Sequence, residues 1–145
     1  KSIETANAWM VIKNVEEDTD YRALLRTFVE DANRAAGRGA GEYTDLQGFI
    51  FVSSAQATTP FHIDAEENIL IQIRGDKFVR TFDNGDRCLI SEEDMEISPS
   101  KHRNQRYEVW FEERATMHRL KPGDALEVEI GDFGVLANAV GPFVE

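Results

Sequence analysis

The fold of this chain is decided by the stretch Thr58-Thr59-Pro60-Phe61-His62-Ile63-Asp64. Its apolar residues alternate with polar ones, which is the pattern of a β-strand with one buried face. Because side chains two apart in a strand point to the same face, His62 and Asp64 would present an imidazole beside a carboxylate. The flanking Phe61 and Ile63 would then turn into a hydrophobic core.

An imidazole and a carboxylate are two of the three ligands in a facial metal triad. With one further imidazole they form the site of non-haem iron oxygenases, which leaves coordination positions open for a co-substrate and dioxygen. His62 and Asp64 are therefore candidate metal ligands and catalytic residues. The presence or absence of a third ligand decides how the function is interpreted.

The composition restricts the classes of partner. A chain of 145 residues fits one domain. It carries 16 Lys and Arg against 27 Asp and Glu, for a formal net charge of -11. Nucleic acids and anionic membranes both select basic surfaces, so we expect neither as a direct partner. An acidic surface that keeps the protein soluble explains the charge by itself.

Cys88 is the only cysteine of the sequence. An intrachain disulfide and a thiolate zinc cluster are therefore excluded, and a reducing, cytoplasmic setting is expected. No apolar run approaches the length of a membrane span. A protein partner with a basic segment or a small molecule remains the expected class of partner.

The first third of the chain predicts one strand and one helix. Residues 9–12 read as a short strand, and residues 20–36 as an amphipathic helix that Asp18 or Thr19 caps. Gly37, Gly39 and Gly41 then end the helix. Because this glycine run neither follows a strand nor opens a helix, a phosphate-binding role is not expected.

From Phe49 onward the pattern changes to short β-rich segments bounded by turn residues. Strands are predicted at residues 49–53, 60–64, 69–73, 78–82, 107–111, 115–120 and 125–130, turns at 83–86 and 122–124, and a polar loop with one short helical turn at 91–106. The tail, residues 134–140, could pair back into the sheet. No long helical pattern intervenes, which favours an antiparallel sandwich or barrel over βαβ units.

These residues resemble a known family, the jumonji-type, cupin-like Fe(II)/2-oxoglutarate-dependent oxygenases, and within it the small bacterial cupin-like subgroup. The matching positions are Thr59 to Asp64, Asn68, Gln72 to Gly75, Lys77 and the Pro122-Gly123-Asp124 turn. The resemblance implies a mainly β fold, the double-stranded β-helix or cupin jelly roll, with one N-terminal amphipathic helix. It also implies a single domain over residues 1–145, with an N-terminal arm and helix in 1–48 and the jelly-roll core in 49–145.

The resemblance also assigns roles to individual residues. It makes His62 and Asp64 iron ligands, Lys77 the cation that pairs with the distal carboxylate of 2-oxoglutarate, and Thr59 a hydroxyl donor to the same group. It makes Asn68 a polar residue of the co-substrate pocket. The implied cofactors are Fe(II) and 2-oxoglutarate. Without the surrounding motif, Lys77 would read as a solvent-facing lysine, and Thr59 as an extended residue before proline.

The third ligand of the family is a histidine shortly after the Pro-Gly-Asp turn, and Gly134 stands at that position here. Glycine has no ligand side chain, so water, another residue or nothing completes the set. His118, His102 and Asp132 are the candidate substitutes for this ligand, although a hydrogen-bonded or solvent-facing histidine and a turn aspartate are the favoured interpretations. A further alternative is that the histidine lies outside these 145 residues.

The sequence therefore predicts an Fe(II)/2-oxoglutarate-dependent oxygenase-like domain with an incomplete facial triad. The alternative is a catalytically inactive cupin-like binding or regulatory module that keeps the pocket but not productive iron. Cys88, Trp9 and Trp110 are interpreted as structural residues. Because the exposed edge of a small jelly roll often pairs with its twin, a homodimer is one expected oligomeric state.

Overall fold

The computed structural model describes residues 2–6, 8–39, 43, 45–55, 57–64, 66–97 and 104–128. The chain divides into two compact units, residues 1–56 and residues 57–145. The motif stretch lies in the second unit. The predicted division into an arm of residues 1–48 and a jelly-roll core of residues 49–145 stays a prediction.

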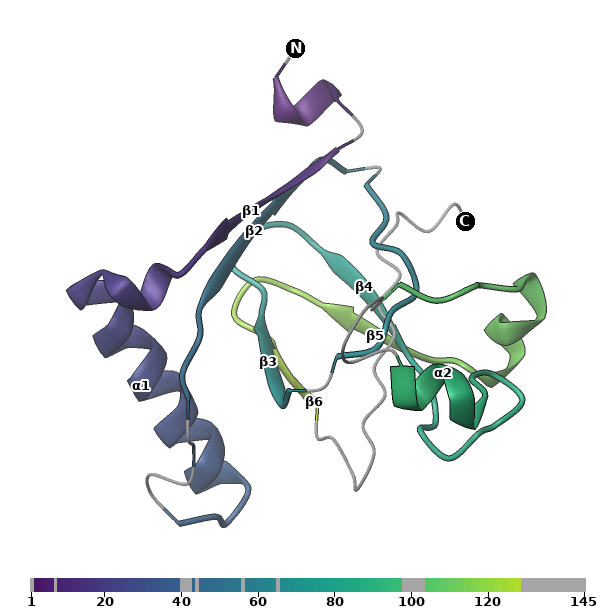
Figure 1. The fold of residues 1–145 in the computed structure, drawn as a ribbon. Helices are drawn as coiled ribbons and strands as arrows, with labels where there is room; N and C mark the ends of the chain where they lie inside the picture. The colour runs from purple at the N-terminus through teal and green to yellow at the C-terminus, as the bar shows by residue number, and fades with distance from the viewer. Residues whose placement is uncertain are drawn as a thin grey trace. The chain divides into compact units, whose positions relative to one another are not determined.

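The first unit combines one antiparallel strand pair with one long helix (Figure 1). Its elements are η1 (Ile3–Thr5), β1 (Trp9–Lys13), η2 (Val15–Glu17), α1 (Thr19–Ala35) and β2 (Phe49–Ser53). Strand β1 pairs with β2 in a register that sets Trp9 opposite Ser53 and Lys13 opposite Phe49. The strand predicted at residues 49–53 is confirmed, and its partner is the strand predicted at residues 9–12.

Helix α1 begins and ends close to the bounds expected from the sequence. The Oδ1 atom of Asp18 accepts hydrogen bonds from the backbone N–H groups of Asp20 and Tyr21, at 3.0 and 3.2 Å. These bonds satisfy two of the donors that a helix N-terminus leaves without intrahelical partners. At the other end Gly37 has φ of 71°, a conformation that glycine adopts without steric cost.

The described residues of the second unit form two nested strand pairs. Its elements are β3 (Asn68–Ile71), β4 (Lys77–Thr81), α2 (Glu92–Ile97), η4 (Val109–Arg114), β5 (Thr116–Leu120) and β6 (Ala125–Val128). Strand β4 pairs antiparallel with β5, and β3 pairs antiparallel with β6. In sequence, the β4–β5 pair therefore lies between β3 and β6. The chain turns between β3 and β4, at residues 72–76, and again between β5 and β6, at residues 121–124.

Backbone hydrogen bonds of Gln72 join these two connecting segments. Its N–H donates to the carbonyl of Asp124 at 3.0 Å, and its carbonyl accepts from the N–H of Gly123 at 2.9 Å. Gly123 has φ of 94° in the predicted turn at residues 122–124. The antiparallel pairing is confirmed, and the second unit is β-rich with some helix. The closed jelly roll itself stays a prediction.

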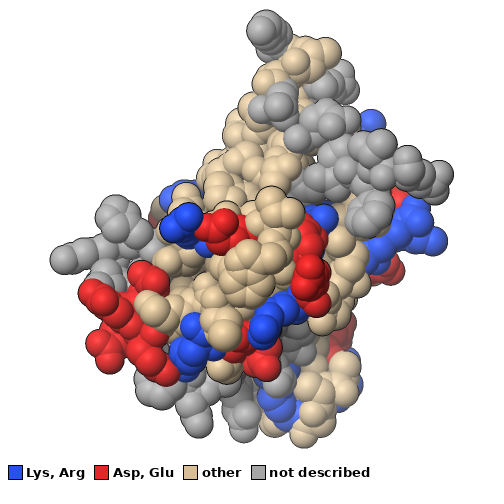
Figure 2. Space-filling view, turned by 90° about the vertical axis from the view of Figure 1, so that its right-hand side faces the viewer, with Lys and Arg blue, Asp and Glu red and all other residues tan. Residues whose placement is uncertain are grey.

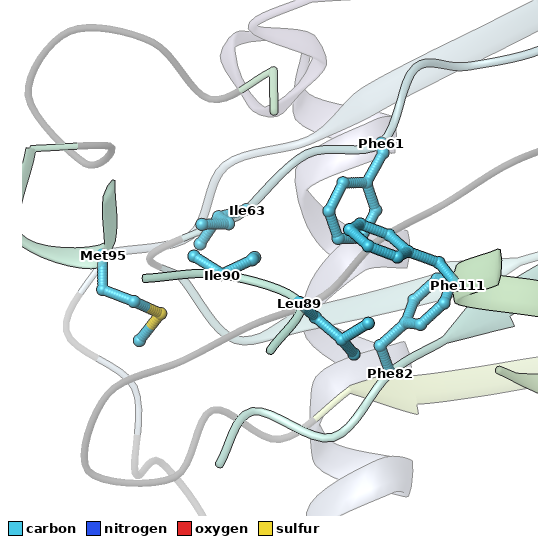
Figure 3. Packing of buried hydrophobic residues seen from close by; sticks show 7 residues of the cluster. All are labelled: Phe61, Ile63, Phe82, Leu89, Ile90, Met95 and Phe111. Carbon is cyan, nitrogen blue, oxygen red and sulfur yellow. The ribbon is translucent and has the colours of Figure 1, made fainter. Parts of the chain in front are cut away.

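The hydrophobic core of the second unit contains both apolar residues of the motif (Figure 3). The cluster consists of Phe61, Ile63, Phe82, Leu89, Ile90, Met95 and Phe111, with Ala115 packed against it. The rings of Phe82 and Phe111 meet that of Phe61 edge-to-face at centroid distances of 5.2 and 5.5 Å. In Figure 3 these three rings lie together, and the side chains of Ile63, Ile90 and Met95 lie at the other end.

The strand predicted at residues 60–64 is wrong. Only His62 makes a β-bridge there, an isolated antiparallel one with Asn104. Pro60 has no N–H to give to a ladder, which is one reason why the segment is extended without being part of a sheet. The alternation of buried and more exposed side chains nevertheless holds, because Phe61 and Ile63 are buried and His62 and Asp64 are not.

The strand predicted at residues 107–111 is also wrong, because a 3-10 helix, η4, covers Val109–Arg114. In a strand Val109 and Phe111 would share one face, yet Val109 is 82% exposed and Phe111 only 4%. The helical turn places Phe111 in the core and leaves its neighbours outside. Packing of one aromatic ring has overridden the β-propensity of the local sequence.

The surface carries both signs of charge. On the face in Figure 2, Lys and Arg side chains lie next to Asp and Glu side chains. Ion pairs of this kind join Arg119 to Asp76, at 2.6 Å, and Arg114 to Asp86. Within the described ranges, no helix is long and apolar enough to cross a membrane.

Candidate functional site

The motif stretch holds its two polar side chains side by side. Phe61 and Ile63 are 4% and 3% exposed and anchor the segment in the core. His62 and Asp64 alternate with them, and their side chains are 14% and 20% exposed. The Nε2 atom of His62 lies 3.4 Å from Oδ2 of Asp64. The juxtaposition expected from the sequence is therefore present.

The backbone fixes the orientation of the imidazole. Nδ1 of His62 lies 2.8 Å from the carbonyl oxygen of Pro60. Because a carbonyl only accepts, Nδ1 is the nitrogen that carries the proton in this contact. A neutral ring then has its lone pair on Nε2, the atom next to the carboxylate of Asp64. Metal-binding histidines are commonly oriented by such a bond from the second ring nitrogen.

The carboxylate of Asp64 has its own orienting partner. The amide Nδ2 of Asn68, at the start of β3, donates to Oδ2 of Asp64 at 3.2 Å and to the carbonyl of Glu66 at 3.0 Å. Asn68 therefore links the motif to the first strand of the unit. The resemblance placed Asn68 in the co-substrate pocket, and that role stays a prediction. Its bond to Asp64 was not foreseen, although a spacing of four residues is compatible with it.

Lys77 is the first residue of β4 and is half-buried. Burial lowers the pKa of its ammonium group, because desolvation disfavours the charged form. Within the described ranges its side chain forms no hydrogen bond or ion pair. A half-buried cation that pairs with none of the described acidic groups can accept an anionic ligand. Thr59, also half-buried, likewise has no side-chain hydrogen bond in the part of the chain that the structure describes.

A third metal ligand does not join His62 and Asp64 among the described residues, where no group of three His, Cys, Asp or Glu side chains could hold a metal ion. His118 lies on β5, with Nε2 2.9 Å from the hydroxyl of Thr81. The interpretation of His118 as a locally hydrogen-bonded imidazole is confirmed. Three other positions considered from the sequence, His102, Asp132 and Gly134, lie outside the described residues.

A second polar group next to the motif was not anticipated. The hydroxyl of Tyr107 donates to Oε1 of Glu112, and Nε of Arg80 donates to Oε2 of the same carboxylate at 2.6 Å. Arg80 and Glu112 are 32 residues apart. Sequence spacing gives no signal for such a contact. The wrong strand prediction at residues 107–111 also excluded the helical turn that brings Glu112 to Tyr107.

The comparison with known families agrees with this geometry. The model of the cupin-like domain family matches residues 2–128. The chain belongs to the cupin-like domain family. The match includes the motif stretch, Asn68, Lys77 and the turn at residues 122–124. No curated protein and no solved structure matches this cupin-like domain.

Proposed function

We propose that this cupin-like domain is an Fe(II)/2-oxoglutarate-dependent oxygenase-like domain in which His62 and Asp64 hold the metal. The observation that carries the proposal is the pair itself, with Nε2 of His62 3.4 Å from Oδ2 of Asp64. Imidazole nitrogen and carboxylate oxygen are donors that suit non-haem Fe(II). A bound cation would take one lone pair from each of these two groups.

The surroundings of the pair fit a metal site as well. The Pro60 carbonyl accepts from His62, and the Asn68 amide donates to Asp64. Outer partners of this kind hold ligands in place before the metal arrives, and their loss commonly weakens metal binding. The two ligands and their orienting groups therefore support the proposal together, although they supply only two of three protein donors.

Lys77 and Thr59 support a dicarboxylate as the co-substrate. The half-buried ammonium of Lys77 would pair with the distal carboxylate of 2-oxoglutarate, and the hydroxyl of Thr59 would donate a hydrogen bond to it. When bound, the metal would supply the chemistry with dioxygen. The residues of this chain would bind and orient the reactants.

The second candidate function is an inactive binding or regulatory module. Gly134 favours it, because glycine stands where the family places its third ligand. Each protein ligand contributes both a bond and preorganisation, so a two-ligand site would depend more on chelation by the co-substrate. The two candidate functions share the proposed ligand-binding residues and differ in turnover.

Anaerobic titration with Fe(II) and 2-oxoglutarate tests the proposal. We expect a metal-to-ligand charge-transfer absorption band in the parent protein and its loss in His62→Ala. His118→Gln is the matched control, because it also removes an imidazole but leaves the pair intact. Absence of the band in the parent protein would refute the oxygenase proposal, and a band that persists in His62→Ala would refute the ligand assignment.

Exposure of the loaded protein to air then separates the two candidate functions. Succinate formed by the parent protein, but not by His62→Ala, would support the oxygenase. A charge-transfer band without succinate would support the binding module. Calorimetric titration of Lys77→Met with 2-oxoglutarate provides a further check, since loss of the cation should weaken binding in both cases.

A further inference from the structure

Among the described residues, the segment that carries His62 and Asp64 belongs to none of the strand pairs of its unit. The bridge between His62 and Asn104 is isolated, and beside it the N–H of Gln105 donates to the carbonyl of Phe61 at 2.8 Å. Among the residues that the structure describes, these backbone contacts do not extend into a regular ladder. Side chains that pack against the segment therefore add to the restraint on the histidine and carboxylate pair.

Tyr107 packs against this segment through its ring and carries a hydroxyl that forms a hydrogen bond. Its ring meets the ring of Phe61 edge-to-face at a centroid distance of 6.0 Å and that of Phe111 at 5.6 Å. Figure 3 shows Phe61 and Phe111 side by side in the core. Phe61 directly precedes His62, so a shift of the Tyr107 ring would be transmitted to the backbone of the candidate ligand.

The hydroxyl of Tyr107 is tied to β4 through two further residues. It donates to one oxygen of Glu112, in η4, and Arg80, in β4, donates to the other at 2.6 Å. The side chain of Arg80 is only 18% exposed. Hydrogen bonds to charged groups are among the stronger ones in proteins, and a carboxylate held on both oxygens has little freedom to rotate.

We propose that Tyr107 is a positioning residue, which fixes the Phe61–His62 backbone against β4 through the hydrogen-bonded chain Tyr107–Glu112–Arg80. Because β4 begins with Lys77, the chain also ties the candidate metal ligand to the strand of the candidate co-substrate cation. The structural part of this proposal concerns contacts between residues of this chain alone. Its consequence for metal binding rests on the proposed function.

Two conservative variants test the hydrogen-bonded chain Tyr107–Glu112–Arg80. Tyr107→Phe keeps the ring and removes the hydroxyl, and Glu112→Gln keeps the shape and removes the charge. Asp86→Asn is the matched control, because it breaks another carboxylate–guanidinium pair of η4, the one with Arg114, which has no part in the chain. Urea unfolding of each variant gives its stability for comparison.

The first readout uses the metal-free protein, so it does not depend on the proposed function. Amide hydrogen exchange at Gln105 reports the bond to Phe61, and the ring nitrogen shifts of His62 report its bond to Pro60. We expect about tenfold faster exchange at Gln105 in Tyr107→Phe and Glu112→Gln, from loss of one hydrogen bond to a charged group. The ring nitrogens of His62 should move toward an average of two tautomers.

The second readout is affinity for Co(II) alone, a spectroscopic substitute for Fe(II). We expect about tenfold weaker binding in either variant, in line with the loss of an orienting partner. The double variant, Tyr107→Phe with Glu112→Gln, should bind Co(II) no more weakly than the weaker-binding single variant. The reason is that both side chains act through the same hydrogen-bonded chain. Asp86→Asn should bind as the parent does.

Each result decides the proposal. Unchanged Gln105 exchange and His62 shifts in both variants would overturn it, even where Co(II) affinity falls. Equal effects in Asp86→Asn would also overturn it, since general destabilisation would then be the cause. A parent protein without Co(II) affinity refutes the metal site, while the exchange measurement still decides whether Tyr107 positions His62.

Discussion

The hydroxyl of Thr81 on β4 lies 2.9 Å from Nε2 of His118 on β5. The bond crosses the strand pair and engages one of the two ring nitrogens through which a histidine can bind a metal. We therefore predict that His118→Gln leaves the Co(II) affinity of the protein within about twofold, and lowers the free energy of unfolding by about 1 kcal/mol, the usual net value of one hydrogen bond. Calorimetric metal titration and urea unfolding measure the two effects. A tenfold or greater loss of metal affinity would instead indicate that His118 is a metal ligand.

Lys77 carries a second prediction, which concerns stability and pH. Burial lowers the pKa of its ammonium in the folded protein below the ordinary value of 10.5. Below the folded pKa both states are protonated, so the folded protein bears the full cost of the half-buried charge. Between the folded pKa and 10.5 the unfolded state binds more protons, so this residue makes stability rise with pH. Above 10.5 the cost is absent.

We therefore expect Lys77→Met to be more stable than the parent protein at pH 7, and the difference to shrink as pH rises toward 10.5. Urea unfolding of both proteins across this range gives the difference directly, and other titrating groups cancel in it. In the presence of 2-oxoglutarate the parent should gain stability and the variant should gain less. A stability difference that does not change with pH would contradict the assigned cause.

The third prediction concerns Tyr107, whose effect on the pH dependence of stability is opposite in sign to that of Lys77. Burial, together with the hydrogen bond and negative charge of Glu112, raises its pKa from 10.0 to about 12, while the nearby charge of Arg80 opposes the shift. Between pH 10 and about 12 the folded state holds the proton that the unfolded state has lost, so this group makes stability fall as pH rises. In the folded protein, ultraviolet titration should show a tyrosine that ionises only near pH 12. That late step should vanish in Tyr107→Phe and move to lower pH in Glu112→Gln.

The sequence predicted most local elements because their determinants are local. The cap at Asp18 and the apolar spacing after it fix α1, and Pro122-Gly123-Asp124 forces the turn before β6. The two wrong strands, at residues 60–64 and 107–111, have different causes. In the first, Pro60 has no N–H to give to a ladder, which is a local feature that the strand assignment underweighted. The second has a non-local cause, because the segment is bent so that Phe111 can reach rings that come from elsewhere in the chain.

The candidate site was predictable in part for the same reason. The alternation around His62 places it beside Asp64 whether or not the segment belongs to a sheet, so the pair could be predicted. The contacts of Tyr107 with Glu112 and of Glu112 with Arg80 depend on how η4 folds over the core, and no spacing rule encodes that. The family resemblance named the candidate ligands and the candidate cation but not the side chains that hold them.

The last prediction concerns the point where β2 meets the helix of the first unit. Gly48 is buried, and its N–H donates to Oε2 of Glu16 at 2.8 Å. A Cβ atom at this position would lie 2.4 Å from Cδ1 of Leu25 and 2.5 Å from Cγ2 of Val15. Both distances are far below van der Waals contact, and side chains must move to relieve them.

We expect Gly48→Ala to lower the free energy of unfolding by about 1–3 kcal/mol, the usual cost of overpacking a core. The double variant Gly48→Ala with Leu25→Ala should lose less than the sum of the two single losses, because removing the leucine methyl groups relieves one of the two clashes. Urea unfolding of the four proteins measures this coupling. Because this strain lies in the first unit, and the candidate ligands lie in the second, Co(II) affinity should be unchanged in folded Gly48→Ala. Additive losses would show that Leu25 does not pack against Gly48.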